Sequence, residues 1–212
     1  LKELLQELSK MKFIRFNRIQ NKLELSEGSS VVVDSLVQQE KTKLKINNNA
    51  RIDELSKLVK HKYYLSRTYN DEKNITRFMK VKLISEESIL NEPINAEDLL
   101  IDKSDGAIYL IVIQDIQNLE KVKEVIKSLK HPRIIIGLLT RDVNNIYHEV
   151  DNLIAVKELL LNKKLLLENK NLKEELTLLV KDYEYKISNF LNSFSNFDSY
   201  VDWFHNGINI SL

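Results

Sequence analysis

The residues best suited to chemistry lie in segment 60–82, where basic and aromatic side chains alternate. Lysine and arginine can neutralise phosphates, and aromatic rings can stack on unpaired bases. The segment therefore indicates a nucleic-acid surface, whose candidate contacts are Lys62, Arg67, Lys73 and Arg77. The alternative is that the lysines only face water while a core contains the rings of Tyr63, Tyr64, Tyr69 and Phe78. Residues 70–73 of the segment predict a turn, and residues 75–84, which continue past its end, predict a strand.

Patterns that are typical of catalytic sites are weak or absent in this sequence. The four histidines are scattered without the spacing of a metal site, and the chain has no cysteine. Gly28-Ser29-Ser30 precedes a predicted helix but lacks the spacing of a phosphate-binding P-loop. The sequence also lacks a G-x-S-x-G nucleophile elbow. We therefore predict no catalytic residue, no metal ligand and no cofactor in this chain.

Two aspartates leave one enzymatic alternative open. Asp115 follows an apolar run, as the acid of a Walker B motif would, but the rest of that motif and a Walker A loop are absent. Its simpler role is to cap the helix that follows. Asp142 follows the next apolar run, and the ends of parallel strands often bind ligands. A metal-dependent nuclease or hydrolase would need these acids grouped around a metal ion.

The elements that must position these residues are clearest at residues 107–140. Two β-branched runs, 108–113 and 134–139, flank a stretch whose apolar residues recur every three or four positions. This pattern predicts two buried parallel strands joined by an amphipathic helix, which is a βαβ unit. The predicted fold class is therefore α/β, with α+β as the alternative, and the unit is expected within a small sheet.

A helix-rich segment follows at residues 141–198. From Leu172 onward its apolar residues fall four and three positions apart, which is typical of a coiled coil or a long helical hairpin. Such a face either folds back on the preceding leucine-rich helix or packs against another copy of the chain, and both arrangements stay open. We define the interaction stripe as Leu172, Leu176, Leu179, Tyr183, Ile187 and Phe190.

These patterns divide the chain into three consecutive segments. Residues 1–140 are expected to form an α/β domain with a basic first half, in which Asp34 caps a helix at residues 35–46. Residues 141–198 form the helical segment. Residues 199–212 predict a terminal β-hairpin with Asn206-Gly207 at its turn.

Composition limits the setting of the protein. The chain has 212 residues, of which 30% are charged and 43% apolar, as in ordinary globular proteins. The lack of cysteine excludes disulfides and favours an intracellular, cytoplasmic setting. The longest apolar runs, about six residues, are far shorter than the roughly 20 that a transmembrane helix needs, so no membrane partner is expected.

Charge and the chain ends give two further expectations. The net charge is +1, but residues 1–85 carry a net charge of +8 and residues 86–212 carry −7. The basic half suits either a polyanion partner or the acidic half of the same chain. Because the chain begins without methionine and ends within a predicted strand, we expect an internal part of a longer protein. The alternative is a trimmed or processed chain.

Four stretches carry a combined pattern: YNDEKNITRF at 69–78, GSSVVVD at 28–34 leading to Glu40-Lys41, a leucine-rich acidic run at 159–178, and WFHNG at 203–207. Together they resemble large bacterial P-loop ATPases of phage-defence and restriction clusters, of the BREX type or linked to phosphorothioation. None of the four is catalytic, and the ATP-binding loop of that family is not in this sequence.

The resemblance implies a non-catalytic regulatory, docking or assembly module of a larger bacterial defence ATPase. Such a module would contact the rest of the parent chain, further copies of itself in a homo-oligomer, partner subunits or DNA. ATP would then bind elsewhere in the parent protein. A DNA- or RNA-binding module that uses segment 60–82 is the alternative function, and a metal-dependent nuclease or hydrolase is the second alternative.

Overall fold

The computed structural model describes residues 4–5, 7–8, 14–17, 22–25, 30–91, 104–140, 143–168, 170–195 and 201–210. The chain divides into two units. The first, called the helical unit, comprises Leu1–Ile46 and His148–Lys186, and the second, called the sheet unit, comprises Asn47–Tyr147 and Ile187–Leu212. This division differs from the three consecutive segments expected from the sequence, because each unit combines stretches that are far apart along the chain.

The sheet unit contains a six-stranded mixed sheet with the strand order β3-β4-β5-β6-β7-β8. Strands β4, β5 and β6 are parallel, whereas β3, β7 and β8 run antiparallel to their neighbours. The α/β class and the parallel βαβ unit predicted from the sequence are therefore confirmed. The strands are β3 (Tyr63–Leu65), β4 (Phe78–Ser85), β5 (Gly106–Val112), β6 (Ile134–Leu139), β7 (Val201–His205) and β8 (Ile208–Ile210).

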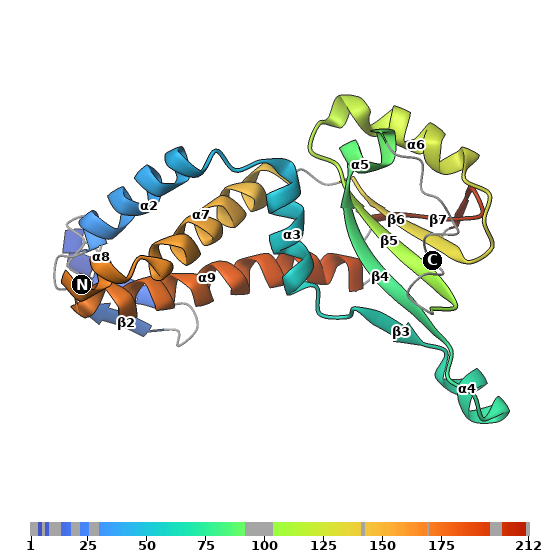
Figure 1. Cartoon of the computed structure of the whole chain (residues 1–212), viewed down its shortest axis with the longest axis horizontal. Coiled ribbons are helices and arrows are strands. Elements are labelled where there is room, and N and C mark those ends of the chain that lie inside the picture. Colours follow the sequence, from blue (N-terminus) through green and yellow to red (C-terminus); the bar gives the residue numbers. More distant parts are fainter. Residues whose placement is uncertain are drawn as a thin grey trace. The chain divides into compact units, whose positions relative to one another are not determined.

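One face of this sheet is covered by α5 (Glu86–Asn91) and α6 (Leu119–Ser128), as Figure 1 shows. Alternate residues of each strand point to this face, because successive side chains of a strand point to opposite sides. They pack against Val122 and Ile126 of α6. The short helix η2 (Ile116–Asn118) leads into α6. The strand residues of this core are Ala107, Tyr109, Ile111, Ile134, Ile136, Leu138 and Phe204.

The opposite face depends on a glycine in the middle of β6. Gly137 lies between Leu110 of β5 and Trp203 of β7 in the strand register. A Cβ atom on Gly137 would lie 2.9 Å from the Trp203 ring and 3.2 Å from a Leu110 methyl carbon. The missing side chain therefore provides the space that the buried Trp203 ring needs. Helix α3 (Asn48–Leu58) packs near β4 and begins at Asn47, whose side chain accepts a hydrogen bond from the Ala50 N–H at 2.9 Å.

The hairpin expected near the end of the chain forms from β7 and β8. Asn206 and Gly207 have positive φ angles of 51° and 76°, as the two central residues of a type I′ turn require. The hairpin also extends the sheet, because β7 pairs with β6.

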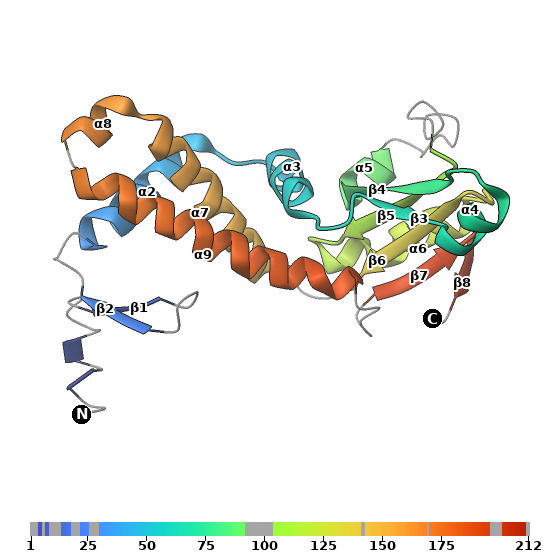
Figure 2. The same ribbon diagram turned by 90° about the horizontal axis from the view of Figure 1, so that it is seen from below.

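The helical unit contains α2 (Ser30–Leu44), α8 (Lys163–Glu168) and the adjoining parts of α7 (Asn144–Leu161) and α9 (Lys170–Ser195). It also contains an antiparallel pair, β1 (Ile14–Asn17) with β2 (Lys22–Leu25). Figure 2 shows α7, α8 and α9 as successive helices, so the predicted helical hairpin is present. Helix α2 begins at Ser30, and Asp34 therefore lies inside it instead of capping it. Gly28 and Ser29 lie outside the described residues.

The core of the helical unit explains why α2 starts early. Val33 and Val37, one turn apart, are both buried in this core. Their burial favours helix over strand at residues 31–33. They pack with residues of α7 and α9, namely Ala155, Val156, Leu159, Leu172 and Leu176.

The interaction stripe is packed inside the chain. Leu172 and Leu176 are in the core of the helical unit, with Leu179 and Tyr183 packed against it. Ile187 and Phe190 are buried in the sheet unit. This is the arrangement that the intramolecular alternative requires. The stripe therefore gives no support to a homo-oligomer, which stays a prediction from the sequence.

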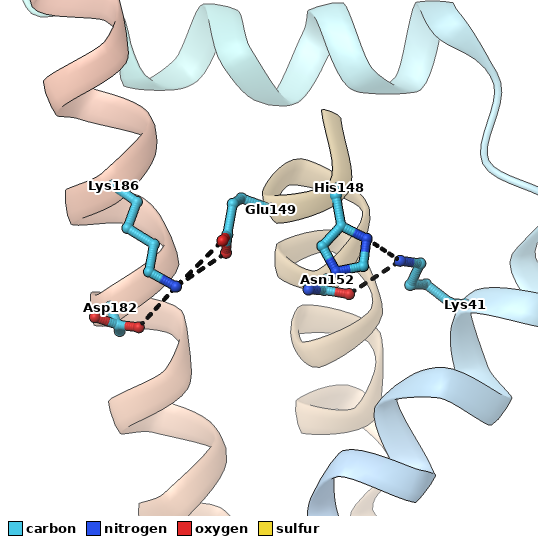
Figure 3. Close-up of polar contacts among 6 residues, drawn as sticks. All are labelled: Lys41, His148, Glu149, Asn152, Asp182 and Lys186. Atoms are coloured by element: carbon cyan, nitrogen blue, oxygen red, sulfur yellow. Dashed lines mark hydrogen bonds and ion pairs between the residues drawn. The ribbon is translucent and has the colours of Figure 1, made fainter. Parts of the chain in front are cut away.

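Polar contacts join α2, α7 and α9 in the helical unit, as Figure 3 shows. Lys41 of α2 donates to the buried Asn152 of α7 at 3.1 Å and lies 3.2 Å from His148 Nδ1. Lys186 of α9 lies 3.1 Å from Glu149 of α7 and 3.2 Å from Asp182 of its own helix. These contacts hold α2, α7 and α9 beside one another around the apolar core of the helical unit.

A tyrosine beside these charges is held in its neutral form. Lys186 lies 5.1 Å from the centre of the Tyr183 ring. Burial, followed by the nearby carboxylates of Glu149, Asp34 and Asp182, raises the pKa of Tyr183 to about 12. These groups disfavour the phenolate because it would add negative charge to a partly buried acidic site.

Within the described residues, no helix is both long enough and apolar enough to span a membrane.

Two leucines test the assignment of the helical core. Leu176→Ala, at a side chain with 0% exposure, should lower the free energy of unfolding of the helical unit by about 2–5 kcal/mol. Leu167→Ala removes the same atoms at a side chain with 83% exposure and should change it by at most about 0.5 kcal/mol. Urea unfolding followed by far-ultraviolet circular dichroism measures both. Equal losses in the two variants would contradict this core.

Candidate nucleic-acid interface

The basic–aromatic arm, defined as residues 60–77, lies at one edge of the sheet. It consists of the edge strand β3, the short helix α4 (Arg67–Lys73) and the segments that join them to their neighbours. Figure 1 shows α4 at the tip of β3 and β4, away from the helices that cover the sheet. Every residue of the arm is exposed except Asn70, which is half-buried.

The tyrosines of the arm are exposed. Their side chains are 59% exposed for Tyr63, 42% for Tyr64 and 46% for Tyr69. Tyr63 meets the half-buried Phe78 edge to face, with the ring centres 6.4 Å apart, and Tyr64 lies 5.6 Å from the His61 ring. The alternative that these rings form a core does not hold for the three tyrosines. Their faces can accept a stacking partner from solvent.

The four candidate cations are all exposed, and they differ in their contacts. Arg77 lies 3.5 Å from the Asp105 carboxylate and 5.9 Å from the centre of the Tyr69 ring. The side chains of Lys62, Arg67 and Lys73 make no hydrogen bond or ion pair with any other residue that the structure describes. Three of the four positive charges are therefore not neutralised by the described part of the chain.

Asn70 holds the arm together. Its side-chain amide donates to the Arg77 carbonyl at 2.9 Å, and its side-chain oxygen accepts the Arg77 N–H at 2.9 Å. Its backbone carbonyl accepts the Ile75 N–H at 3.1 Å. Asn74 ends α4 in the left-handed conformation, with φ 52° and ψ 44°, which asparagine tolerates. The side chain of Asn70 thus joins α4 to the start of β4.

Asp105 fixes the base of the arm. The Phe78 N–H donates to its carboxylate at 2.9 Å, and the Asp105 N–H donates to the Phe78 carbonyl at 3.0 Å. These bonds tie the first residue of β4 to the residue that precedes β5. The arm is therefore anchored at the end of the sheet where the parallel strands begin.

A groove runs along the arm beside β3. It has a volume of about 630 Å³ and is lined by residues 60–65 and by Arg67. Its lining combines two lysines and an arginine with His61, Tyr63 and Tyr64. A groove of this composition can hold a flexible polyanion that also has flat apolar groups.

The opposite end of the sheet has a second polar cluster with a structural role. The buried Glu86 carboxylate accepts the Gln114 N–H at 2.7 Å, the Asp115 N–H at 3.1 Å and the Asn118 side-chain amide at 3.2 Å. Asp115 accepts the Gln117 N–H at 3.0 Å, which is the capping role predicted for it. The two carboxylates therefore accept backbone N–H groups of residues 114, 115 and 117, between β5 and α6.

Tyr147 lies near this cluster. Burial, followed by the negative charge of Glu86, raises its pKa to about 12, although the positive charge of Arg51 acts in the opposite direction. The Arg51 guanidinium lies 5.3 Å from the centre of the Tyr147 ring and donates to Asn48 at 3.1 Å. Asn48 in turn donates to Glu87 at 3.0 Å. These contacts position α3 beside the end of β4.

The catalytic alternatives gain no support from this geometry. Among the described residues, no group of three or more His, Cys, Asp or Glu side chains could hold a metal ion. Asp142, which a metal site with Asp115 would need, lies outside the described residues.

Two important residues were not found from the sequence. Residues 70–73 were expected to form a turn, but they belong to α4, and the role of Asn70 appears only from its contacts with Arg77. Glu86, the buried first residue of α5, was not among the candidate residues. A polar residue directly after a buried strand was the available signal for Glu86.

Comparisons with protein-family models, curated proteins and solved structures give no match to this chain. The sequence resemblance to defence ATPases therefore has no support from them, and the candidate interface depends on the geometry of the chain itself.

The role of Asn70 can be tested by hydrogen exchange. Asn70→Ala removes both side-chain bonds to Arg77, so amide protection at residues 66–77 should fall while that of β5 and β6 is unchanged. Thr68→Ala, at an exposed residue of the same helix, should leave both regions unchanged. Equal protection in the Asn70 variant and the parent would contradict this account of the arm.

The raised pKa of Tyr147 predicts that the protein loses stability at alkaline pH. Because folding raises its pKa from 10 to about 12, its contribution to stability is complete below pH 10 and is lost as the pH rises to 12. Tyr147→Phe should reduce the decline of the free energy of unfolding by about 1.4 kcal/mol per pH unit between pH 10 and pH 12. Urea unfolding at several pH values, followed by the fluorescence of Trp203, reports the sheet unit. Parallel declines for variant and parent would contradict the prediction.

Proposed function

We propose that this chain binds single-stranded nucleic acid along the basic–aromatic arm. The observation that carries the proposal is the exposure of Tyr63, Tyr64 and Tyr69 beside Lys62, Arg67 and Lys73. A group of exposed apolar side chains on one part of the surface usually marks a contact site. Three exposed rings beside cations without a charged partner in the described chain suit a ligand that alternates phosphates with flat bases.

Charge favours a polyanion over a neutral peptide. Segment 60–82 has seven lysines and arginines against two acidic residues, Asp71 and Glu72. As an edge strand, β3 could also pair with an extended peptide, but it has only three residues. Such a short strand offers few backbone bonds, whereas each cation can release counterions on meeting a phosphate.

The rings favour single strands over duplexes. In a duplex the faces of the bases are already stacked, and a protein reads base edges in the grooves instead. In a single strand each base has a free face, and stacking on an aromatic side chain contributes about 1–3 kcal/mol per base. The exposed tyrosine faces therefore have a use in single-strand binding that duplex binding would not give them.

The wider setting that we propose comes from the sequence resemblance. It is a regulatory or docking module of a larger, cytoplasmic defence ATPase, in which the arm would contact exposed single strands. The observation behind it is the pattern YNDEKNITRF at residues 69–78, which spans α4 and the start of β4. Reading the full gene tests this setting, because a parent chain without a P-loop would exclude it.

Salt dependence tests the role of the cations. Lys62→Ala with Arg67→Ala should reduce the slope of log affinity against log salt by about 1.4, because each phosphate contact on a single strand contributes about 0.7. The matched control, Lys163→Ala with Lys164→Ala, removes two exposed cations from α8 and should leave the slope unchanged. Fluorescence anisotropy with a labelled oligothymidine measures all three proteins.

The tyrosines give an independent readout in the same assay. Tyr63→Ala should weaken binding roughly 5- to 150-fold, which corresponds to one lost stack, without changing the salt slope. If the parent chain does not bind the oligothymidine at low salt, or if both double variants behave alike, the proposed function is wrong.

A further inference from the structure

A cavity opens on the face of the sheet that α5 and α6 leave uncovered. It has a volume of about 430 Å³, within the roughly 300–1,000 Å³ that is typical of small-molecule sites. It lies in the sheet unit, bounded by the sheet, the end of α3 and the last part of α9. Its size therefore suits a group such as a nucleoside.

The cavity is apolar inside and polar at its edge. Its apolar side chains are buried or half-buried. They are Leu58 and Val59 at the end of α3, Val81, Ile108, Leu110, Leu191 and Trp203. Ser188 and Asn192 of α9 add a hydroxyl and a carboxamide. Lys57, Lys60, His61 and Tyr64 complete the lining and are exposed to solvent. An aromatic ring with polar edge atoms matches this combination.

The cavity adjoins the groove on the arm. Lys60, His61 and Tyr64 line both spaces. A strand whose phosphates follow the lysines of the groove thus reaches the cavity without leaving the protein surface. Gly137 contributes to this geometry, because its lack of a side chain lets the Trp203 ring lie against the sheet where the cavity forms.

We propose that the cavity receives one unpaired nucleobase of a single strand bound on the arm. This inference rests on the proposed function and adds a base-binding subsite to it. The apolar side chains contact the faces of the base, and Ser188 and Asn192 bond to its polar edge. Lys60, at the opening shared with the groove, contacts the phosphate of the same nucleotide.

The only tryptophan of the chain makes the proposal measurable. Trp203 lines the cavity, so a base that enters should change its fluorescence. Titration with an unlabelled ten-residue oligothymidine should change this emission with the same midpoint that competition in the anisotropy assay gives. An oligonucleotide of equal length in which every base is replaced by an abasic residue should bind more weakly and leave the emission unchanged.

Variants of the polar edge provide the second readout. Ser188→Ala with Asn192→Ala should weaken oligothymidine binding roughly 5- to 150-fold, the effect of one base, while the salt slope keeps its parental value. Asn145→Ala, at an exposed asparagine of α7, is the control and should bind like the parent.

The outcomes separate the two proposals. Binding without a change in Trp203 emission, or an unchanged affinity of the Ser188 and Asn192 variant, overturns the base-binding subsite and leaves binding on the arm intact. The absence of any binding to the parent chain overturns both.

Discussion

Strand β4 pairs with two neighbouring strands at once, and the arrangement of the sheet unit depends on this double pairing. Along Met79–Ser85 it pairs in parallel with β5, and along Phe78–Lys80 it pairs antiparallel with β3. Its last residues reach the buried core, whereas its first residues are half-buried. Because β4 is one continuous strand, its buried end keeps its half-buried start, and therefore the arm, in a fixed position. Without β4, the tyrosines and cations of the arm would have no fixed arrangement.

Local hydrogen bonds complete what the strand begins. The Asn70 side chain binds the backbone of Arg77, and the Asp105 carboxylate binds the backbone of Phe78. At this exposed end of the sheet, the two side chains form hydrogen bonds with backbone groups that would otherwise bond to water. At the other end of β4, Glu86 does the same for the loop after β5. These side chains position backbone segments, which leaves the exposed side chains of the arm for a ligand.

Much of the fold could be predicted because buried strands and helices have a recognisable pattern of apolar residues in the sequence. The continuous apolar runs of β5 and β6 and the repeat in α6 gave the βαβ unit, and Asn206-Gly207 gave the final hairpin. The start of α2 and the helix α4 were missed, because residues 31–33 suit a strand locally and residues 70–73 suit a turn. The two-unit division joins segments distant in sequence, which local patterns do not encode.

The site was only partly predictable. Alternation of basic and aromatic residues selected segment 60–82, but the same pattern fits a half-buried strand, and only the structure shows Tyr63, Tyr64 and Tyr69 at the surface. The cavity was not foreseen because its lining comes from α3, β4, β5, β7 and α9.

Photo-crosslinking tests the central claim most directly, because it maps contacts without altering the protein. A single-stranded oligonucleotide containing 5-iodouracil is bound to the intact chain and irradiated, and the adducts are located by mass spectrometry of the peptides. Binding on the arm predicts adducts at Tyr63, Tyr64 or Tyr69. Adducts confined to residues 143–186, or to the loop around Asp115, would contradict it.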